Sequence, residues 1–311
     1  MTKMAASPNK QSNIPTNTLR DVSQAITPIN YLHWSLSIII VAFVIQFLWL
    51  VINNDTFQWD VVFKWFFDET VINGLYVTLG LTVVAMVVGT IIGLVLAVCR
   101  LSKSHIASSG AAIYIWFFRG TPMLVQLIFW YNMATIFPYI TISIPFGPTL
   151  ISWETNSIIT PLTAAIVGLA LNEAAYMAEI IRGGLLSVDP GQSETAQAFG
   201  MTRTRALWRI IIPQAMRSIV PPTGNQLISM IKGTSLVSII AMNDLLYSVQ
   251  AVYNRTFEII PLLMVAVIWY LIITSILNIG QSFIERYYAR GQRMSETSPA
   301  INIAKPVEDA Q

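Results

Sequence analysis

Long apolar runs separated by short polar segments dominate the pattern of this 311-residue chain. A helix rises 1.5 Å per residue, so about 20 apolar residues are needed to cross a hydrocarbon layer roughly 30 Å thick. Several stretches approach or exceed that length, and we expect each of them to form a membrane-spanning helix. These stretches are Trp34–Ile52, Val71–Val98, Met123–Ile140, Leu162–Ile181, Ile219–Ala241 and Ile260–Ile284.

The first apolar stretch follows a polar leader of about 30 residues, which is too long for the charged start of a signal peptide. No small-x-small cleavage site follows the stretch either. We therefore interpret residues 34–52 as an anchoring transmembrane helix behind a flexible tail, residues 1–33. A second polar tail is expected at residues 290–311, because no periodic apolar pattern continues there.

The third apolar region is ambiguous because Arg119-Gly120-Thr121-Pro122 interrupts it after Ala111–Phe118. In the preferred interpretation, residues 114–118 lie along the interface and the span starts at Pro122 with Thr121 as its N-cap. In the alternative, one broken helix places Arg119 near a polar cavity, because irregular backbone inside a membrane needs protein or water around it.

Composition agrees with a membrane protein, since 54% of the residues are hydrophobic and 11% are charged. A soluble protein of this size could not cover its surface with so few polar groups. The single Cys99 excludes a disulfide within the chain. We expect an all-α polytopic fold with about six transmembrane helices.

The distribution of Lys and Arg predicts the orientation of these helices. When the predicted loops are assigned to alternate sides, one side holds nearly all the basic residues, while Arg119 and Lys232 remain unassigned. The basic side holds Lys3, Lys10, Arg20, Arg100, Lys103, Arg182, Arg203, Arg205, Arg209, Arg217, Arg286, Arg290, Arg293 and Lys305, and the other side holds Lys64 and Arg255. Under the positive-inside rule, both termini and the loop at residues 189–213 are cytoplasmic.

The cytoplasmic loop at residues 189–213 has the signals of two short helices set at an angle. Asp189 can cap the first helix, with Pro190 at its first position, and Gly200 can end it in a left-handed turn. Thr202 can cap a second helix, which we expect to end near Pro213 because proline removes a donor.

The sequence of this loop resembles the EAA loop of bacterial ATP-binding-cassette (ABC) importer permeases. Glu194-Thr195-Ala196 stands where the family has Glu-Ala-Ala, and Ile210-Ile211-Ile212-Pro213 stands where it has Ile-x-Leu-Pro. Both departures are conservative and keep the spacing. The resemblance implies contact with an ATPase. The residues implied in this coupling are Glu194, Ala196, Gly200, Ile210 and Pro213.

A second set of motifs resembles one branch of these permeases, the importers of histidine, glutamate, glutamine, arginine and opines. The interrupting segment Phe118–Pro122, followed by Gln126, looks like the signature of this branch, and Arg119, Gly120, Thr121, Pro122 and Gln126 are implied in gating or structure. Further motifs that agree are residues 74–79, 175–184, 190–192 and 232–236, with Asn225. The implied permease domain covers residues 73–286, so the helix at residues 34–52 is an addition to it.

The resemblance implies the permease subunit of an ABC importer, with the type I transmembrane fold, in the bacterial inner membrane. Such a subunit moves polar amino acids by alternating access. The implied partners are an ABC ATPase dimer, a second permease subunit, an extracytoplasmic solute-binding protein, the amino acid and membrane lipid, without nucleic acid. The chain itself would bind no cofactor and no metal, while ATP and Mg would bind the ATPase.

The sequence contains few of the residue patterns that an enzyme would need. A phosphate-binding loop needs a Gly-Lys pair, and the chain contains none. The two histidines, His33 and His105, lie on different segments, so we expect no catalytic residues. The alternative function is a secondary transporter or channel, because Glu173 and Lys232 would also suit a proton relay.

Polar residues within the predicted fourth and fifth spans are candidates for the substrate pathway. Counting from Leu162, Asn172 and Glu173 lie about 15 Å deep, near the bilayer centre. Tyr176 can share a face with both, and Lys232 lies at a comparable depth in the fifth span. Glu173 and Lys232 could bind the two ends of an amino acid, or they could simply neutralise each other.

Three further patterns have simpler interpretations. Gly89 and Gly93 form a Gly-x-x-x-Gly motif, which could mediate dimerisation or pack helices within the chain. Glu179 and Arg182, three residues apart on one helix, are expected to form a structural pair. The acidic, aromatic segment at residues 55–69 is expected to be external and to lie along the membrane interface.

Overall fold

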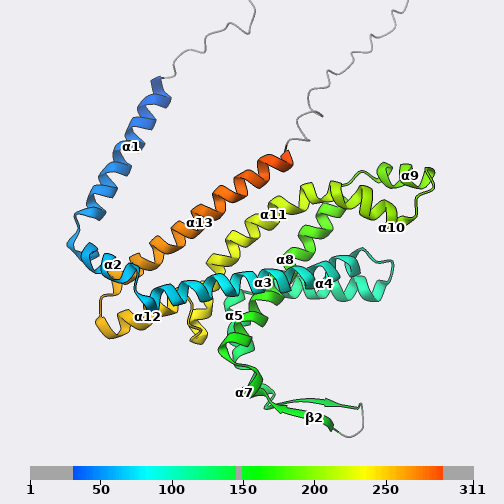
Figure 1. Cartoon of the computed structure of the whole chain (residues 1–311), viewed down its shortest axis with the longest axis horizontal. Coiled ribbons are helices and arrows are strands. Elements are labelled where there is room, and N and C mark those ends of the chain that lie inside the picture. The colour runs from blue at the N-terminus through cyan, green and yellow to red at the C-terminus, as the bar shows by residue number, and fades with distance from the viewer. Residues whose placement is uncertain (1–30, 145–148, 290–311) are drawn as a thin grey trace, which may run out of the picture. The chain divides into compact units, whose positions relative to one another are not determined.

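The structure, a computed structural model, describes residues 31–144 and 149–289 and is drawn in Figure 1. The predicted tails at residues 1–33 and 290–311 lie outside these ranges, apart from residues 31–33 at the start of the first helix. The chain divides into two compact units at residues 54 and 55. The first unit contributes the single described helix α1, Tyr31–Ile52, which matches the predicted span closely.

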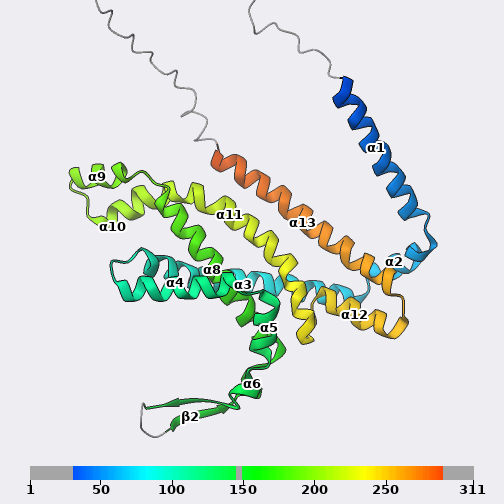
Figure 2. The ribbon, with the colours of Figure 1, turned by 180° about the vertical axis from the view of Figure 1, so that it is seen from behind.

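The second unit is an assembly of helices with one small sheet, seen from opposite sides in Figures 1 and 2. Its elements are η2 (Asp55–Phe57), α2 (Trp59–Phe66), α3 (Glu69–Leu101), α4 (His105–Gly120), α5 (Met123–Tyr131), α6 (Met133–Ile136), β1 (Tyr139–Ser143), β2 (Thr149–Glu154), α7 (Thr155–Ile158), α8 (Pro161–Leu186), α9 (Pro190–Ala198), α10 (Arg203–Ala206), the π-helical η3 (Leu207–Ile211), α11 (Ile212–Gly233), the 3-10 helix η4 (Thr234–Ile240), α12 (Leu245–Thr256) and α13 (Ile259–Ala289).

Among the described residues, four helices are long and apolar enough to cross a membrane: α1, α3, α8 and α13. Two further candidates are pairs of helices bent at a break, α4 with α5 at 102° and the run 203–240 with α12 at 45°. If each bent pair counts as one span, the total is six. The polytopic helical fold expected from the sequence is therefore confirmed.

The predicted third span at Met123–Ile140 is wrong. Helix α5 ends at Tyr131, and nine residues rise only about 14 Å, which is too short to cross a bilayer. The apolar segment before the break is instead a full helix, α4, with Ala111, Ile115 and Phe118 buried. Thr121 ends α4 and Pro122 caps α5, so the broken-helix alternative describes this region better than an interfacial segment.

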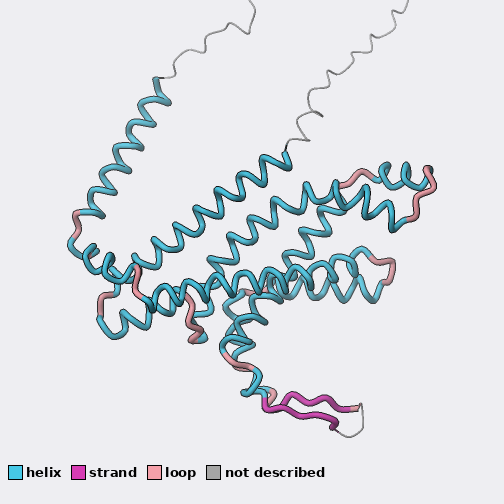
Figure 3. Tube along the Cα trace, viewed as in Figure 1, coloured by secondary structure: helices cyan, strands magenta, loops and turns pink. Residues whose placement is uncertain are grey.

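An antiparallel hairpin, unexpected in an all-α prediction, follows α6 and is drawn magenta in Figure 3. Ile140 pairs with Trp153 and Ile142 with Ile151, so these apolar side chains share one face of the ribbon. The β-branched residues favour this extended form. Thr155 anchors the base of the hairpin, because its N–H donates to the Pro138 carbonyl at 2.9 Å.

Helix α2 lies in the acidic, aromatic segment described above, and one of its faces packs against α13. The indole N–H of Trp269 donates to the Phe66 carbonyl at 2.9 Å, and the two rings stack with centroids 4.7 Å apart. Phe63 remains exposed. The segment is therefore amphipathic, as a helix at a membrane interface would be.

The core of the second unit depends on the close approach of α3 and α8. A Cβ atom at Gly89 would lie 2.8 Å from the Glu173 Cβ, and one at Gly93 would lie 2.8 Å from the Met177 Cβ. Such distances leave no room for a side chain, so the two glycines allow the backbones to approach. The Gly-x-x-x-Gly motif thus packs helices within the chain.

We predict that Gly93→Ala separates α3 from α8 and destabilises the protein. Its new methyl group would meet Met177 and the Ala174 carbonyl, the latter at 2.9 Å. Overpacking of this kind costs about 1–3 kcal/mol, which should lower the melting temperature of the purified protein in detergent. The matched control is Gly80→Ala on the same helix, where a Cβ meets nothing within 4 Å. Equal melting temperatures for the two variants would contradict the prediction.

Candidate functional site

A cavity of about 430 Å³ lies where α5, α8 and α11 come together. Asn172, Glu173 and Tyr176, three of the residues expected along the substrate pathway, line it. Lys232 is exposed and does not belong to the lining. The lining residues are Thr121, Pro122, Met123, Asn172, Glu173, Tyr176, Gln226, Ser229, Met230 and Gly233.

Glu173 is the charged side chain of this cavity, and it is only 1% exposed. Its Oε2 atom accepts a hydrogen bond of 2.9 Å from Gln226 Nε2, while Oε1 is buried without a partner among the described residues. Among the described residues, Glu173 and Lys232 form no ion pair. The alternative in which the two charges simply neutralise each other is therefore not found. A buried carboxylate with a free oxygen is a strong acceptor for a cation or a donor.

Asn172 is part of the cavity wall and also binds the break between α4 and α5. Its side-chain amide donates to the Phe118 carbonyl at 3.0 Å and to Gln126 Oε1 at 3.2 Å, and the Gln126 amide donates to the same carbonyl at 3.1 Å. This carbonyl is four residues before Pro122, which has no N–H to satisfy it. Asn172 thus uses both amide hydrogens to stabilise the break between α4 and α5.

Two residues of the interrupting motif, Thr121 and Pro122, line the cavity. Gln126 also donates to Thr121, at 3.1 Å to its carbonyl and 2.6 Å to its hydroxyl, and this ties the start of α5 to the end of α4. The guanidinium of Arg119 lies over the Tyr176 ring, 5.2 Å from its centroid. Around Gly120 a Cβ would meet nothing within 4 Å. Arg119, Gly120 and Gln126 are not among the lining residues, so the cavity brings together only part of the motif.

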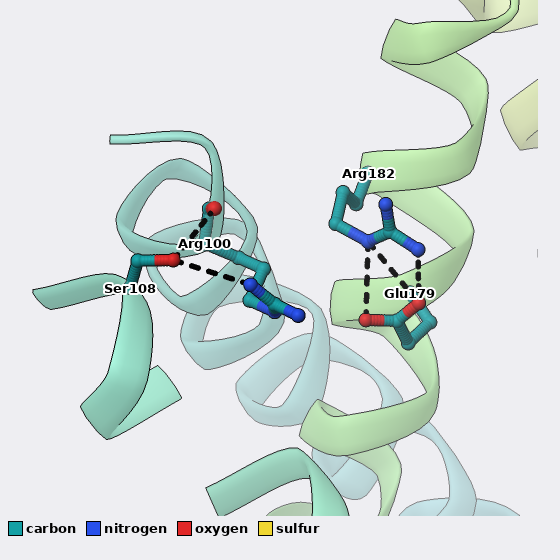
Figure 4. Close-up of polar contacts among 4 residues, drawn as sticks. All are labelled: Arg100, Ser108, Glu179 and Arg182. Carbon is teal, nitrogen blue, oxygen red and sulfur yellow. Dashed lines mark hydrogen bonds and ion pairs between the residues drawn. The ribbon is translucent and has the colours of Figure 1, made fainter. Parts of the chain in front are cut away.

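Glu179 and Arg182 form the structural pair expected from their spacing (Figure 4). Arg182 Nη2 lies 2.7 Å from Glu179 Oε2, and its Nε lies 3.2 Å from both carboxylate oxygens. Arg100, also drawn in Figure 4, donates to the Ser108 hydroxyl at 3.2 Å. Both arginines therefore have partners within the chain.

The first half of the loop at residues 189–213 folds as predicted. Asp189 caps α9 by accepting from the Gly191 N–H at 2.7 Å, and Pro190 takes the first helical position. Glu194, in the middle of α9, is exposed. Gln214 of α11 donates to Gln192 at 3.2 Å, which holds α9 against the following helix.

Gly200 ends α9 in a left-handed turn with φ +72°, as expected. Its N–H donates to the Gln197 carbonyl at 2.9 Å, and the Met201 N–H donates to the Ala196 carbonyl at 3.0 Å, a Schellman motif. Ala196 is only 2% exposed, whereas Gly200 has open space around it. Phe199, beside the turn, is 84% exposed.

The second helix of the loop begins as predicted but does not end near Pro213. Thr202 accepts from the Arg205 N–H, and α10 continues through η3 into α11, as Figure 2 shows. The Ile212 N–H donates to the Leu207 carbonyl five residues back, so the helix has π register at this point. Pro213 then falls at the start of the new α register, where a missing donor costs little. Ile210 is half-buried in the π segment.

Sequence reasoning missed Gln226, which holds Glu173. The available signal was a polar amide inside the predicted span at residues 219–241, the same signal that singled out Glu173. Neighbouring Ser229 gives a second polar group to the cavity. Both residues lie on α11. The face of α11 that points toward α8 is set by helix packing, which a hydropathy pattern does not reveal.

Comparison with known proteins agrees with this arrangement. Residues 89–290 match the family described as the binding-protein-dependent transport system inner membrane component. The chain is 39% identical to the arginine transport system permease protein ArgU of Corynebacterium glutamicum over 280 residues, covering 89% of this chain and 86% of that protein. It is 35% identical to the L-cystine transport system permease protein TcyB of Bacillus subtilis, covering 73% and 90%.

A solved structure leads to the same family, and a second one shares the fold. A crystal structure of an amino acid ABC transporter with histidines is 35% identical, with a TM-score of 0.60, and covers 70% of this chain and 94% of that one. An inward-facing methionine ABC transporter shares the fold at 18% identity, with a TM-score of 0.56 and coverage of 71% and 97%. The chain therefore belongs to the binding-protein-dependent inner membrane components of ABC importers.

Proposed function

We propose that this chain is the permease of an ATP-driven importer of polar amino acids, and that the cavity beside Glu173 binds the amino acid in transit. One observation carries the proposal: a buried carboxylate keeps an unpartnered oxygen in a cavity of about 430 Å³. A protonated amine is the complementary ligand. The named substrates of the relatives, arginine, L-cystine and octopine, all contain a protonated amine.

One continuous helical run, from α10 through η3 to α11, connects the loop at residues 189–213 with the cavity. On the positive-inside rule the loop of α9 and α10 is cytoplasmic, where an ABC ATPase dimer that binds ATP and Mg can dock. From α10 the helix continues without a gap into α11, which carries Gln226. A displacement of the loop therefore moves the amide that holds Glu173, and this would change access to the cavity.

Further partners follow from the same proposal. The pathway forms together with a second permease subunit, and an extracytoplasmic solute-binding protein delivers the amino acid. The coupling residues are Glu194, Ala196, Gly200, Ile210 and Pro213. Lys232, exposed within this chain, would face the second subunit or the water-filled pathway, because lipid is an unfavourable environment for its charge.

Reconstitution of the permease with its ATPase and solute-binding protein in proteoliposomes tests the function directly. We expect ATP-dependent uptake of radiolabelled L-arginine, and a reduction of about 10-fold or more in Glu173→Gln, since a charge-assisted hydrogen bond contributes about 1.5–3 kcal/mol. Glu69→Gln, which alters an exposed glutamate, is the control. Full uptake by Glu173→Gln would refute the role of this carboxylate.

The turn at Gly200 provides a separate test of coupling. Gly200→Val should abolish the stimulation of ATPase activity by loaded binding protein, because a β-branched residue is strained at φ +72°. Gly200→Asn should retain most of the stimulation, since asparagine tolerates this conformation. Equal loss in both variants would show that the position matters for partner contact rather than for the turn.

A further inference from the structure

An apolar groove of about 570 Å³ lies between α3, α8 and the helical run from η3 into α11. The described residues that line it are apolar apart from two threonines, Thr90 and Thr223, and none of them is charged. The Thr223 hydroxyl already donates to the Ile219 carbonyl of its own helix at 2.8 Å. A polar solute would lose its water in this groove without gaining hydrogen bonds, whereas a hydrocarbon chain would lose nothing.

The apolar groove and the cavity beside Glu173 lie on opposite sides of the contact between α8 and α11. On α8, Asn172 lines the cavity and Ile181 lines the groove, and on α11 Ser229 lines the cavity and Val220 the groove. Each pair is nine residues apart, which is two and a half helical turns and therefore opposite faces of the helix. A ligand in the groove would thus be separated from the cavity by both helices.

The apolar groove reaches the ends of the helices that form it. Val98 lies three residues before the end of α3, and Leu185 lies one residue before the end of α8. Trp208, which lines the groove from the π-helical segment, is 67% exposed. Tryptophan at the end of a membrane helix is typical of the interface between hydrocarbon and water. The groove therefore opens at the level of the lipid headgroups.

Two exposed arginines bracket Trp208 at this end of the groove. Arg205 precedes Trp208 by three residues and so lies on the same side of the helix, and Arg209 follows it directly. Neither arginine forms an ion pair with a described residue, and Glu194 of the neighbouring helix α9 does not pair with them. A guanidinium group matches the oxygens of a phosphate in both charge and geometry.

We propose that the apolar groove binds an anionic phospholipid, with an acyl chain between α3 and α11 and the phosphate at Arg205 and Arg209. The charge complementarity favours a lipid over a further apolar helix, which would bring no anion to the arginines. Anionic lipids of the cytoplasmic leaflet are attracted to basic segments at the membrane surface. The lipid would contact the helical run that joins the loop at residues 189–213 to Gln226, and its site does not depend on the function proposed for Glu173.

Native mass spectrometry of the purified permease–ATPase complex in detergent tests the site by measuring the lipid that the complex retains. The probes are palmitoyl-oleoyl phosphatidylglycerol and the zwitterionic phosphatidylcholine with the same chains. The wild-type complex should prefer phosphatidylglycerol. The double variant Arg205→Gln/Arg209→Gln should bind it roughly 30-fold more weakly and lose the preference, since each basic residue contributes a factor of about 5. Arg217→Gln is the charge control, because this exposed arginine lies two residues before Ile219 and faces away from the groove.

A second variant tests the acyl chain without altering the arginines. Leu94→Trp fills the groove from α3 and should weaken the retention of both lipids, because the chain loses its place in either case. The matched control is Val83→Trp, a comparably exposed position on the same helix that does not line the groove. This control should retain both lipids as the wild type does.

The outcomes distinguish a lipid site from the two protein contacts that could use the same surface. Unchanged phosphatidylglycerol binding in the double arginine variant overturns the phosphate site, and a loss of ATPase stimulation in that variant would assign the arginines to the ATPase instead. Unchanged retention in Leu94→Trp overturns the acyl-chain site. If Leu94→Trp instead loses the second permease subunit from the complex, the groove is an interface between subunits and the proposal fails.

Discussion

The arrangement of the cavity depends on one backbone carbonyl, that of Phe118. Proline at position 122 cannot donate to it, and an unsatisfied carbonyl away from water costs several kcal/mol. Asn172 and Gln126 both donate to this oxygen and also bond to each other. Three helices, α4, α5 and α8, are thereby joined at one point. The sharp bend at Pro122 and the side chains around it have their positions because this carbonyl must be satisfied.

Features that depend on local chemistry or on summed hydropathy could be predicted from the sequence. The long helices followed from apolar length, since a span must remain apolar over many residues. Asp189, Gly200 and Thr202 were identified from capping and turn preferences, which act within four or five residues. Glu173 was recognised because a carboxylate deep within an apolar helix needs a specific environment.

Features that depend on contacts between distant segments could not be predicted in the same way. Hydropathy does not distinguish a short helix followed by a β-hairpin from one long span, so the region after Met123 was assigned wrongly. A proline normally ends a helix, but the π register before Pro213 allows the helix to continue. The depth of Lys232 along its helix did not reveal which way it faces, because that direction depends on how α11 packs.

The contact between Gly89 and Glu173 links the cavity to a residue that lines no part of it. Since the Cβ and Cγ atoms of Glu173 occupy the space where a side chain at position 89 would lie, the two positions share one volume. The Cβ of Glu173 and the Ala170 carbonyl both border this space, so even a shortened side chain at position 173 would leave no room for a larger residue at position 89. The side chain at position 173 can therefore change in chemistry without a change at position 89, whereas the glycine itself is required by the separation of the two backbones.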